Sequence, residues 1–330
     1  MSKKLNQAIE EKKRLYLLYG QEQYIIDKYV DIIIQNFLRE EEKDLNLEVQ
    51  ATLPKDIYEL INQLNTLPFM SEYRVVVLKD TGIFEHKDKD ALDKLLEKMQ
   101  DLPETTVLIV KEKKVDKKRK LYKFFQTKGI VEEQNFLTEE QIIRYIQKWF
   151  RREERSIQDK AIRELINRVG TELTALLMEC EKLVALAEGE VTVAMVKALV
   201  MENPEISIFQ LTDALARKDR NTAMEYYHQL LKNRESLVYI LAVISKQMRQ
   251  LCQIKAMQAA RASSDEITRS LSLHPFVVKK LMTQARTFDT RELNHLLKEL
   301  VQLEWDFKRG KADLETGLEL MVVRLTQKIS

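Results

Sequence analysis

Strand-like and helix-like hydrophobic patterns alternate up to about residue 140 of this 330-residue chain, and only helix-like patterns follow. Runs typical of strands occur at residues 15–19, 73–78, 106–110 and 130–132, and the segment before the second of them, 56–67, has the apolar spacing of a helix. Strands that alternate with helices build parallel βαβ units. The first part of the chain is therefore predicted to be a parallel sheet covered by helices.

The part of the chain after the last strand pattern begins with a capping box, in which Thr138 is the N-cap and Gln141 the third helical residue. Further helices are predicted at residues 158–169, 172–187 and 193–200. Four or five longer helices are expected from residue 207 to the end, the clearest at 237–257. The chain has only seven glycines and five prolines, which indicates long helices with short connections.

These patterns predict an α/β region followed by an all-α region, divided into three domains. We place a parallel-sheet domain at residues 1–140, a small helical domain at 141–206 and a helical bundle at 207–330. A chain of 330 residues is too long for one ordinary core, which agrees with this division.

The composition argues against several classes of protein. Hydrophobic residues make up 45% and charged residues 32% of the chain, so disorder is not expected. No run approaches the roughly 20 apolar residues of a membrane span, and the first residues lack the apolar core of a secretion signal, so we expect a cytoplasmic protein. Cys180 and Cys252 are too few for a disulfide framework or a zinc site and are interpreted as packing residues.

The first strand pattern ends at Gly20, where a phosphate-binding loop would lie in a nucleotide-binding sheet. Such a loop needs two glycines five positions apart, followed by a lysine and a hydroxyl residue. Gly20 is followed by none of these, and no strand ends in a clear magnesium-binding carboxylate, Asp80 being a weak candidate. The sequence therefore predicts no ATP site.

Residues suited to other chemistry are equally sparse. The four histidines, His86, His228, His274 and His295, are far apart in sequence, and none forms a zinc or hydrolase motif. We predict no catalytic residue, no cofactor and no metal ion.

One basic segment, residues 111–120, has seven basic and two acidic side chains, although the whole chain has a net charge of only +2. It follows a strand of the predicted sheet, where ligands of parallel sheets bind, so either a phosphate-contacting loop or a solvated loop fits it. The polar side of the helix at 237–257 is a second, more diffuse basic surface. The candidate DNA contacts are Lys117, Lys118, Arg119, Lys246 and Arg249.

The loop between the helix at 56–67 and the strand at 73–78 contains the apolar residues Leu67, Pro68, Phe69 and Met70. Pro68 fixes its own φ and favours an extended conformation at Leu67, so these residues form a turn outside the helix. Such an apolar group either fills the core of its own domain or contacts a partner.

Several blocks of sequence, in their order and spacing, resemble the delta subunit of the bacterial replicative clamp loader, part of the DNA polymerase III holoenzyme. They are residues 15–22, 67–78, 115–123, 169–173, 179–183, 208–215 and 274–280. The resemblance covers nearly the whole chain. It implies an AAA+-like domain without a P-loop, a small helical lid domain and a helical collar domain that holds the loader together.

The resemblance also implies a function. Members of this family bind and open the ring-shaped sliding clamp (beta) during DNA replication, while the ATPase subunits (tau/gamma) hydrolyse ATP. Together with delta prime they form a heteropentamer that acts on primed DNA, with no membrane partner. Catalysis is expected only of the holoenzyme, which is a DNA-directed DNA polymerase, and not of this subunit.

The family's clamp-binding element is a hydrophobic wedge tipped by a Leu-Phe pair, and the resemblance assigns it here to Leu67, Pro68, Phe69 and Met70. Phe69 takes the aromatic position. Pro68 stands where the family has leucine, so Leu67 is the alternative source of the aliphatic group. Two other functions are compatible with the sequence: an ATP-dependent remodelling factor with a divergent phosphate loop, and a DNA-binding adaptor.

Overall fold

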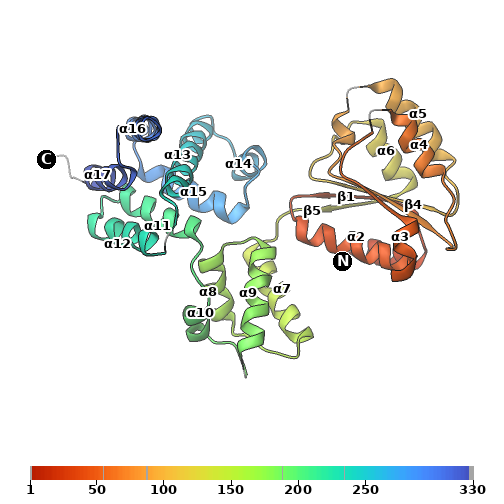
Figure 1. The fold of residues 1–330 in the computed structure, drawn as a ribbon, viewed down its shortest axis with the longest axis horizontal. Helices are drawn as coiled ribbons and strands as arrows, with labels where there is room; N and C mark the ends of the chain where they lie inside the picture. Colours follow the sequence, from red (N-terminus) through yellow and green to blue (C-terminus); the bar gives the residue numbers. More distant parts are fainter. Residues whose placement is uncertain (1, 55, 87, 188, 234, 327–330) are drawn as a thin grey trace. The chain divides into compact units, whose positions relative to one another are not determined.

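The computed structural model describes residues 2–54, 56–86, 88–187, 189–233 and 235–326. The chain divides into two compact units, Met1–Phe136 and Leu137–Ser330, which differ in class (Figure 1). The first unit is α/β and the second is all-α, so the predicted order of fold classes is confirmed.

The first unit contains a five-stranded sheet in the order β2-β3-β4-β1-β5, in which every pairing of neighbouring strands is parallel. The strands are β1 (Leu15–Gly20), β2 (Leu47–Gln50), β3 (Arg74–Lys79), β4 (Thr106–Glu112) and β5 (Ile130–Gln134). The three central strands are buried on both faces, which explains their nearly continuous apolar runs. The sequence patterns missed β2, because this edge strand is only four residues long and half-exposed.

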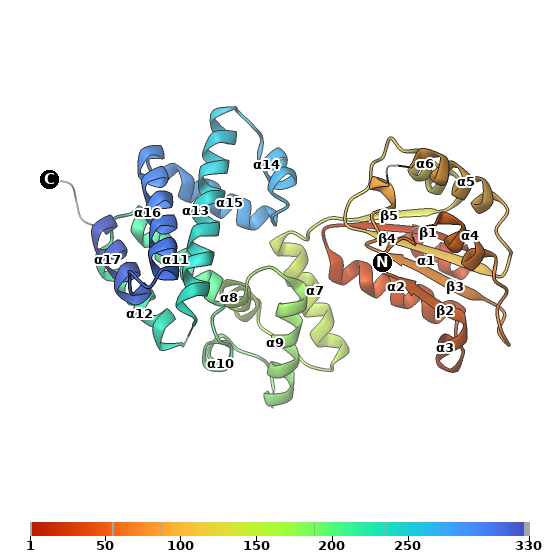
Figure 2. The ribbon, with the colours of Figure 1, turned by 45° about the horizontal axis from the view of Figure 1, so that its top comes forward.

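Helices cover both faces of this sheet (Figures 1 and 2). They are α1 (Lys3–Glu10), α2 (Gln23–Phe37), α3 (Lys43–Asn46), α4 (Ile57–Asn65), α5 (Lys89–Gln100) and α6 (Lys120–Lys128), with 3-10 turns η1 (Glu40–Glu42) and η2 (Ile83–Glu85). Helices α4, α5 and α6 lie on one face and bury Leu60, Leu95 and Phe125 in a common core with the strands. Helix α2 lies on the other face.

The second unit begins with α7 at the predicted capping box: Gln141 N donates to Thr138 Oγ1 at 3.3 Å, and Thr138 N donates to Gln141 Oε1 at 2.8 Å. Its first helices are α7 (Glu139–Arg152), α8 (Asp159–Val169), α9 (Leu173–Leu186) and α10 (Val193–Leu199). The remaining ones are α11 (Pro204–Ala216), α12 (Arg220–Lys232), α13 (Leu237–Ala259), α14 (Ser264–Leu271), α15 (Pro275–Thr287), α16 (Thr290–Lys308) and α17 (Leu314–Thr326).

The expectation of four or five helices after residue 207 is wrong, since seven lie in the described residues from α11 onward. The physical reason is that several turns use non-glycine residues in the left-handed conformation. Lys218, Arg261 and Ser272 have φ values of 58°, 61° and 52°. Counting glycines therefore underestimates the number of helix ends in this chain.

One hydrophobic core joins α11 to α17, and a buried polar network lies within it. Gln247 Nε2 donates to Thr212 Oγ1 at 2.6 Å and to Gln284 Oε1 at 2.8 Å, connecting α13 to α11 and α15. The predicted boundary at residues 206/207 falls in the first turn of α11, and the one at 140/141 in the first turn of α7. The division into three domains stays a prediction.

Both cysteines are free thiols in helices of the second unit. Cys180 is fully buried in α9, and burial raises the pKa of its thiol to about 12, as expected of a packing residue. Cys252 is half-buried in α13. Within the described ranges, no helix is both long and apolar enough to cross a bilayer.

Candidate functional site

The chain leaves helix α4 after Asn65 because the backbone becomes extended at Thr66. Asp56 caps the start of α4 by accepting from the amide of Tyr58, and the helix ends at Asn65. Thr66 then has φ −68° and ψ 128°, and Pro68 lies two residues further on. The apolar face of α4 is already buried against the sheet, so the loop residues lie beyond it.

The apolar side chains of this loop point into solvent. Leu67 is 68% exposed, Phe69 58% and Met70 87%, while Pro68 is half-buried. None of the three exposed side chains fills the core of the domain, so the alternative of a core plug does not describe this structure. An exposed group of large apolar side chains is typical of a binding surface.

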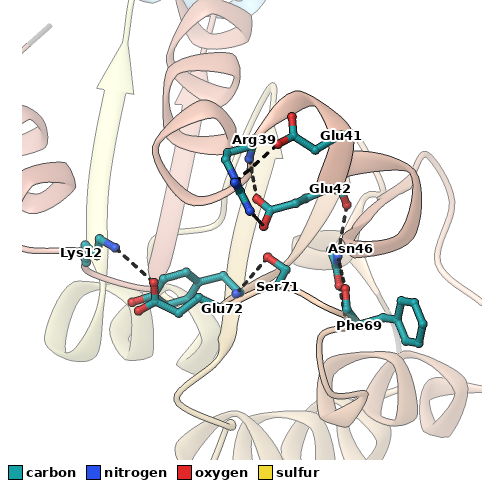
Figure 3. Close-up of polar contacts among 9 residues, drawn as sticks. Lys12, Arg39, Glu41, Glu42, Asn46, Phe69, Ser71 and Glu72 are labelled. Carbon is teal, nitrogen blue, oxygen red and sulfur yellow. Dashed lines mark hydrogen bonds and ion pairs between the residues drawn. The ribbon is translucent and has the colours of Figure 1, made fainter.

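The backbone of the loop is held by a buried side chain from α3. The amide of Phe69 donates to Asn46 Oδ1 at 2.7 Å, and Asn46 Nδ2 donates to the carbonyl of Phe69 at 2.9 Å. Figure 3 shows this pair of bonds, with the ring of Phe69 pointing away from Asn46. The next residue, Met70, is in the left-handed conformation with φ 51°.

The other end of the loop is held by Tyr73, whose ring packs edge-on against Phe37 at a centroid distance of 5.0 Å. Lys12 Nζ lies 4.9 Å from the centroid of the Tyr73 ring and 3.7 Å from a carboxylate oxygen of Glu72. The amide of Tyr73 donates to Ser71 Oγ at 3.5 Å. The wedge, defined as Leu67, Pro68, Phe69 and Met70, is therefore an exposed apolar turn whose backbone is held at Phe69 and followed by the anchored Tyr73.

Acidic partners neutralise part of the basic segment of the first unit. Lys117 Nζ lies 2.8 Å from Glu133, whose hydrogen bond raises the pKa of the Lys117 ammonium. Arg119 Nε lies 3.6 Å from Asp116. Lys118 is exposed and has no acidic partner among the described residues.

The two predicted contacts in the second unit lie on the polar side of α13. Lys246 Nζ lies 3.2 Å from a carboxylate oxygen of Glu205. Arg249 is exposed. A DNA-binding role for these five basic residues stays a prediction.

The end of β1 has a different geometry from a phosphate cradle. Gly20 has φ 134°, and a Cβ there would lie 2.1 Å from the carbonyl oxygen of Gln134 in β5. The amides of Gln21 and Glu22 both donate to that same carbonyl, at 2.8 and 3.1 Å. Gly20 is thus required by the close approach of two strands, and these amides are already used inside the protein. No group of three or more potential metal ligands occurs in the described part of the chain.

Sequence reasoning missed Asn46, the residue that holds the wedge. It lies 23 positions before Phe69, at the end of a four-residue helix. No local pattern marks it, since its role depends on a contact made only in the folded domain.

Comparisons with known proteins identify the family. The model of the DNA polymerase III delta subunit matches residues 16–135, and the model of the C-terminal domain of that subunit matches residues 205–325. The chain belongs to the DNA polymerase III delta subunit family. Together the two matches cover well over half of it, and the resemblance in the sequence is confirmed.

Delta subunits of two bacteria are similar to this chain over most of their length. The chain is 28% identical to DNA polymerase III subunit delta of Bacillus subtilis (strain 168), over 95% of this chain and 93% of that protein. It is 21% identical to the probable DNA polymerase III subunit delta of Aquifex aeolicus (strain VF5), over 89% and 85%. The solved structure of the Bacillus subtilis DNA clamp loader delta protein superposes with a TM-score of 0.81, covering 98% of this chain and 99% of that one. The expected fold class, a parallel-sheet α/β domain followed by helical regions, is confirmed.

Proposed function

We propose that this delta subunit, as a component of the clamp loader, binds the ring-shaped sliding clamp through the wedge and promotes opening of the ring. The observation that carries the proposal is the exposure of Leu67, Phe69 and Met70 on a turn with a fixed backbone. Neighbouring exposed apolar side chains of this size are costly in water and gain most from a complementary pocket.

Burial of the wedge can supply a large part of the binding energy of the interface. Burying Phe69 and one aliphatic neighbour in a preformed pocket contributes roughly 2 to 3 kcal/mol each before the entropic costs of association. Part of that entropic cost is already paid in the free chain, because the backbone of the loop is held at Phe69 and Tyr73. Phe69 is expected to be the centre of the interface.

Ring opening follows if the wedge fits the opened or distorted clamp better than the closed ring. A ligand shifts a conformational equilibrium only by its difference in affinity for the two states. The delta subunit then uses binding energy rather than bond chemistry, and needs no catalytic residue of its own.

Hydrolysis of ATP is assigned by this proposal to other subunits. The amides at the end of β1 donate to Gln134 and leave no cradle for phosphates, which supports a subunit without ATPase activity. The ATPase subunits (tau/gamma) and delta prime complete a heteropentamer, joined through the helical collar of residues 207–330. It acts on primed DNA at replication forks in the cytoplasm.

The test measures binding of the purified sliding clamp to the purified chain by surface plasmon resonance. Changing Leu67→Ala and Phe69→Ala together is expected to weaken binding about a hundredfold or more, because two anchors are lost. Circular dichroism and thermal unfolding should be unchanged, since both side chains are exposed.

The matched control is Leu186→Ala, which removes a side chain of similar exposure, 62%, from α9. This variant should bind the clamp as the unchanged chain does. Full clamp affinity in the folded double variant would refute the proposal.

A further inference from the structure

The side chain of Asn46 makes three hydrogen bonds to the backbone while fully buried. Its Oδ1 accepts from the amide of Phe69 at 2.7 Å, and its Nδ2 donates to the carbonyl of Phe69 at 2.9 Å and to the carbonyl of Glu42 at 3.1 Å. Both polar backbone groups of Phe69 are thereby bonded to one side chain, as they would be to a neighbouring strand (Figure 3).

A carboxamide is suited to this contact because it carries a donor and an acceptor side by side. An aspartate would lack the donor, and a serine or alanine would not reach both groups. The residue that Asn46 holds is the one whose ring is exposed, and Met70 beside it has a positive φ. Left-handed backbone at a non-glycine residue persists only where its surroundings impose it.

We propose that Asn46 is a positioning residue for clamp binding, which fixes the wedge before the clamp arrives. This inference rests on the proposed function. It adds a residue that does not itself contact the clamp and acts by holding the backbone of Phe69. Without Asn46 the backbone at residues 69 and 70 can sample other conformations. The apparent affinity for the clamp is then divided by the fraction of molecules that hold the binding conformation.

The expected effect of Asn46→Ala is a clamp affinity about tenfold lower, since ordering the backbone of one residue corresponds to about one decade in affinity. The loss should appear as slower association, because fewer molecules present the wedge correctly. Phe69→Ala, in contrast, removes the contact itself and should accelerate dissociation.

A double-mutant cycle separates positioning from a general loss of structure. In a Phe69→Ala background, adding Asn46→Ala should change clamp affinity less than about twofold, because no aromatic anchor is left to position. A merely structural role would lower affinity by the same factor in both backgrounds, and that result would overturn the inference.

Limited proteolysis with chymotrypsin reports on the loop without the clamp. Asn46→Ala should be cleaved faster after Phe69, with no faster cleavage elsewhere; the bond after Leu67 is resistant because Pro68 follows it. The matched control is Thr106→Val, which removes another fully buried side-chain bond to the backbone, from Thr106 Oγ1 to the carbonyl of Leu64 at 3.0 Å. This control should leave clamp affinity within about twofold.

Asn46→Ser is the second variant if Asn46→Ala does not fold, because its hydroxyl and the space it leaves allow water to reach the freed groups. It should show the same slower association. Unchanged clamp binding by a folded Asn46 variant, while Phe69→Ala binds weakly, would overturn the positioning role and leave the proposed function intact. Full binding by Phe69→Ala would overturn both.

Discussion

Gly20 shows how one residue can be needed for packing at a place where nucleotide-binding proteins need glycine for chemistry. Its Cα lies against the backbone of Gln134, so that the ladder between β1 and β5 leaves no room for a side chain. The residue also has a φ of 134°, which L side chains rarely adopt. Glycine is therefore needed at position 20 for the close packing of β1 against β5.

Gly20→Ala is expected to lower the free energy of unfolding of the first unit by about 3 kcal/mol, from the backbone clash together with the unfavourable φ. Thermal or urea unfolding followed by circular dichroism measures the loss.

The control is Gly82→Ala, at a residue that also has a positive φ, 70°, but has open space around it. This variant should lose only about 1 kcal/mol, from the conformational cost alone. Equal losses in the two variants would show that close packing is not the reason for glycine at position 20.

At the scale of elements, the basic segment that links β4 to α6 is less basic than its sequence indicates. Lys111 is buried and lies 2.5 Å from Asp27, Lys117 is paired with Glu133, and Lys120 lies 2.7 Å from a carboxylate oxygen of Asp93. A phosphate would have to displace these carboxylates. Among the candidate DNA contacts of this segment, Lys118 is exposed and has no acidic partner in the described residues, so it is the one most available to a phosphate.

If the assembled loader contacts primed DNA through this segment, Lys118→Ala should weaken binding and reduce the slope of log affinity against log salt by about 1. Lys117→Ala should have a smaller effect, because Glu133 already neutralises Lys117. Fluorescence anisotropy with labelled primed DNA at several salt concentrations measures the affinity and the salt slope of both variants. A larger effect of Lys117→Ala would contradict this assignment.

At the scale of the whole molecule, the side chains of the wedge are exposed on the surface of the single chain. The isolated chain is therefore expected to bind the clamp with the same affinity whether or not ATP and magnesium are present. Under the proposed function, control by ATP would then act through neighbouring subunits that cover or uncover the wedge.

Surface plasmon resonance of the isolated chain with and without ATP and magnesium checks this expectation, and isothermal titration with ATP should give no binding heat. Magnesium alone serves as the control. Measurable ATP binding, or clamp affinity that depends on ATP, would favour the rival hypothesis of a remodelling factor with a divergent phosphate loop.

Local patterns in the sequence were enough to predict the elements whose signals are short-range. The alternation of strands and helices indicated the parallel sheet, the Thr138 and Gln141 pair marked the start of α7, and the apolar loop around Phe69 stood out between a helix and a strand. Hydrophobic periodicity and capping involve residues a few positions apart, so they can be read along the chain.

Contacts between distant residues decided the rest. The edge strand β2, the bond between Asn46 and Phe69, and the pairing of Lys117 with Glu133 were absent from the predictions. Each depends on side chains or strands brought together by the fold, 16 or more positions apart in the last two cases. The sequence by itself determined that an apolar turn would stand at the end of α4. Only the tertiary structure decided that this turn faces solvent with a fixed backbone, because exposure and anchoring depend on what the rest of the domain leaves uncovered and what it places within hydrogen-bond reach.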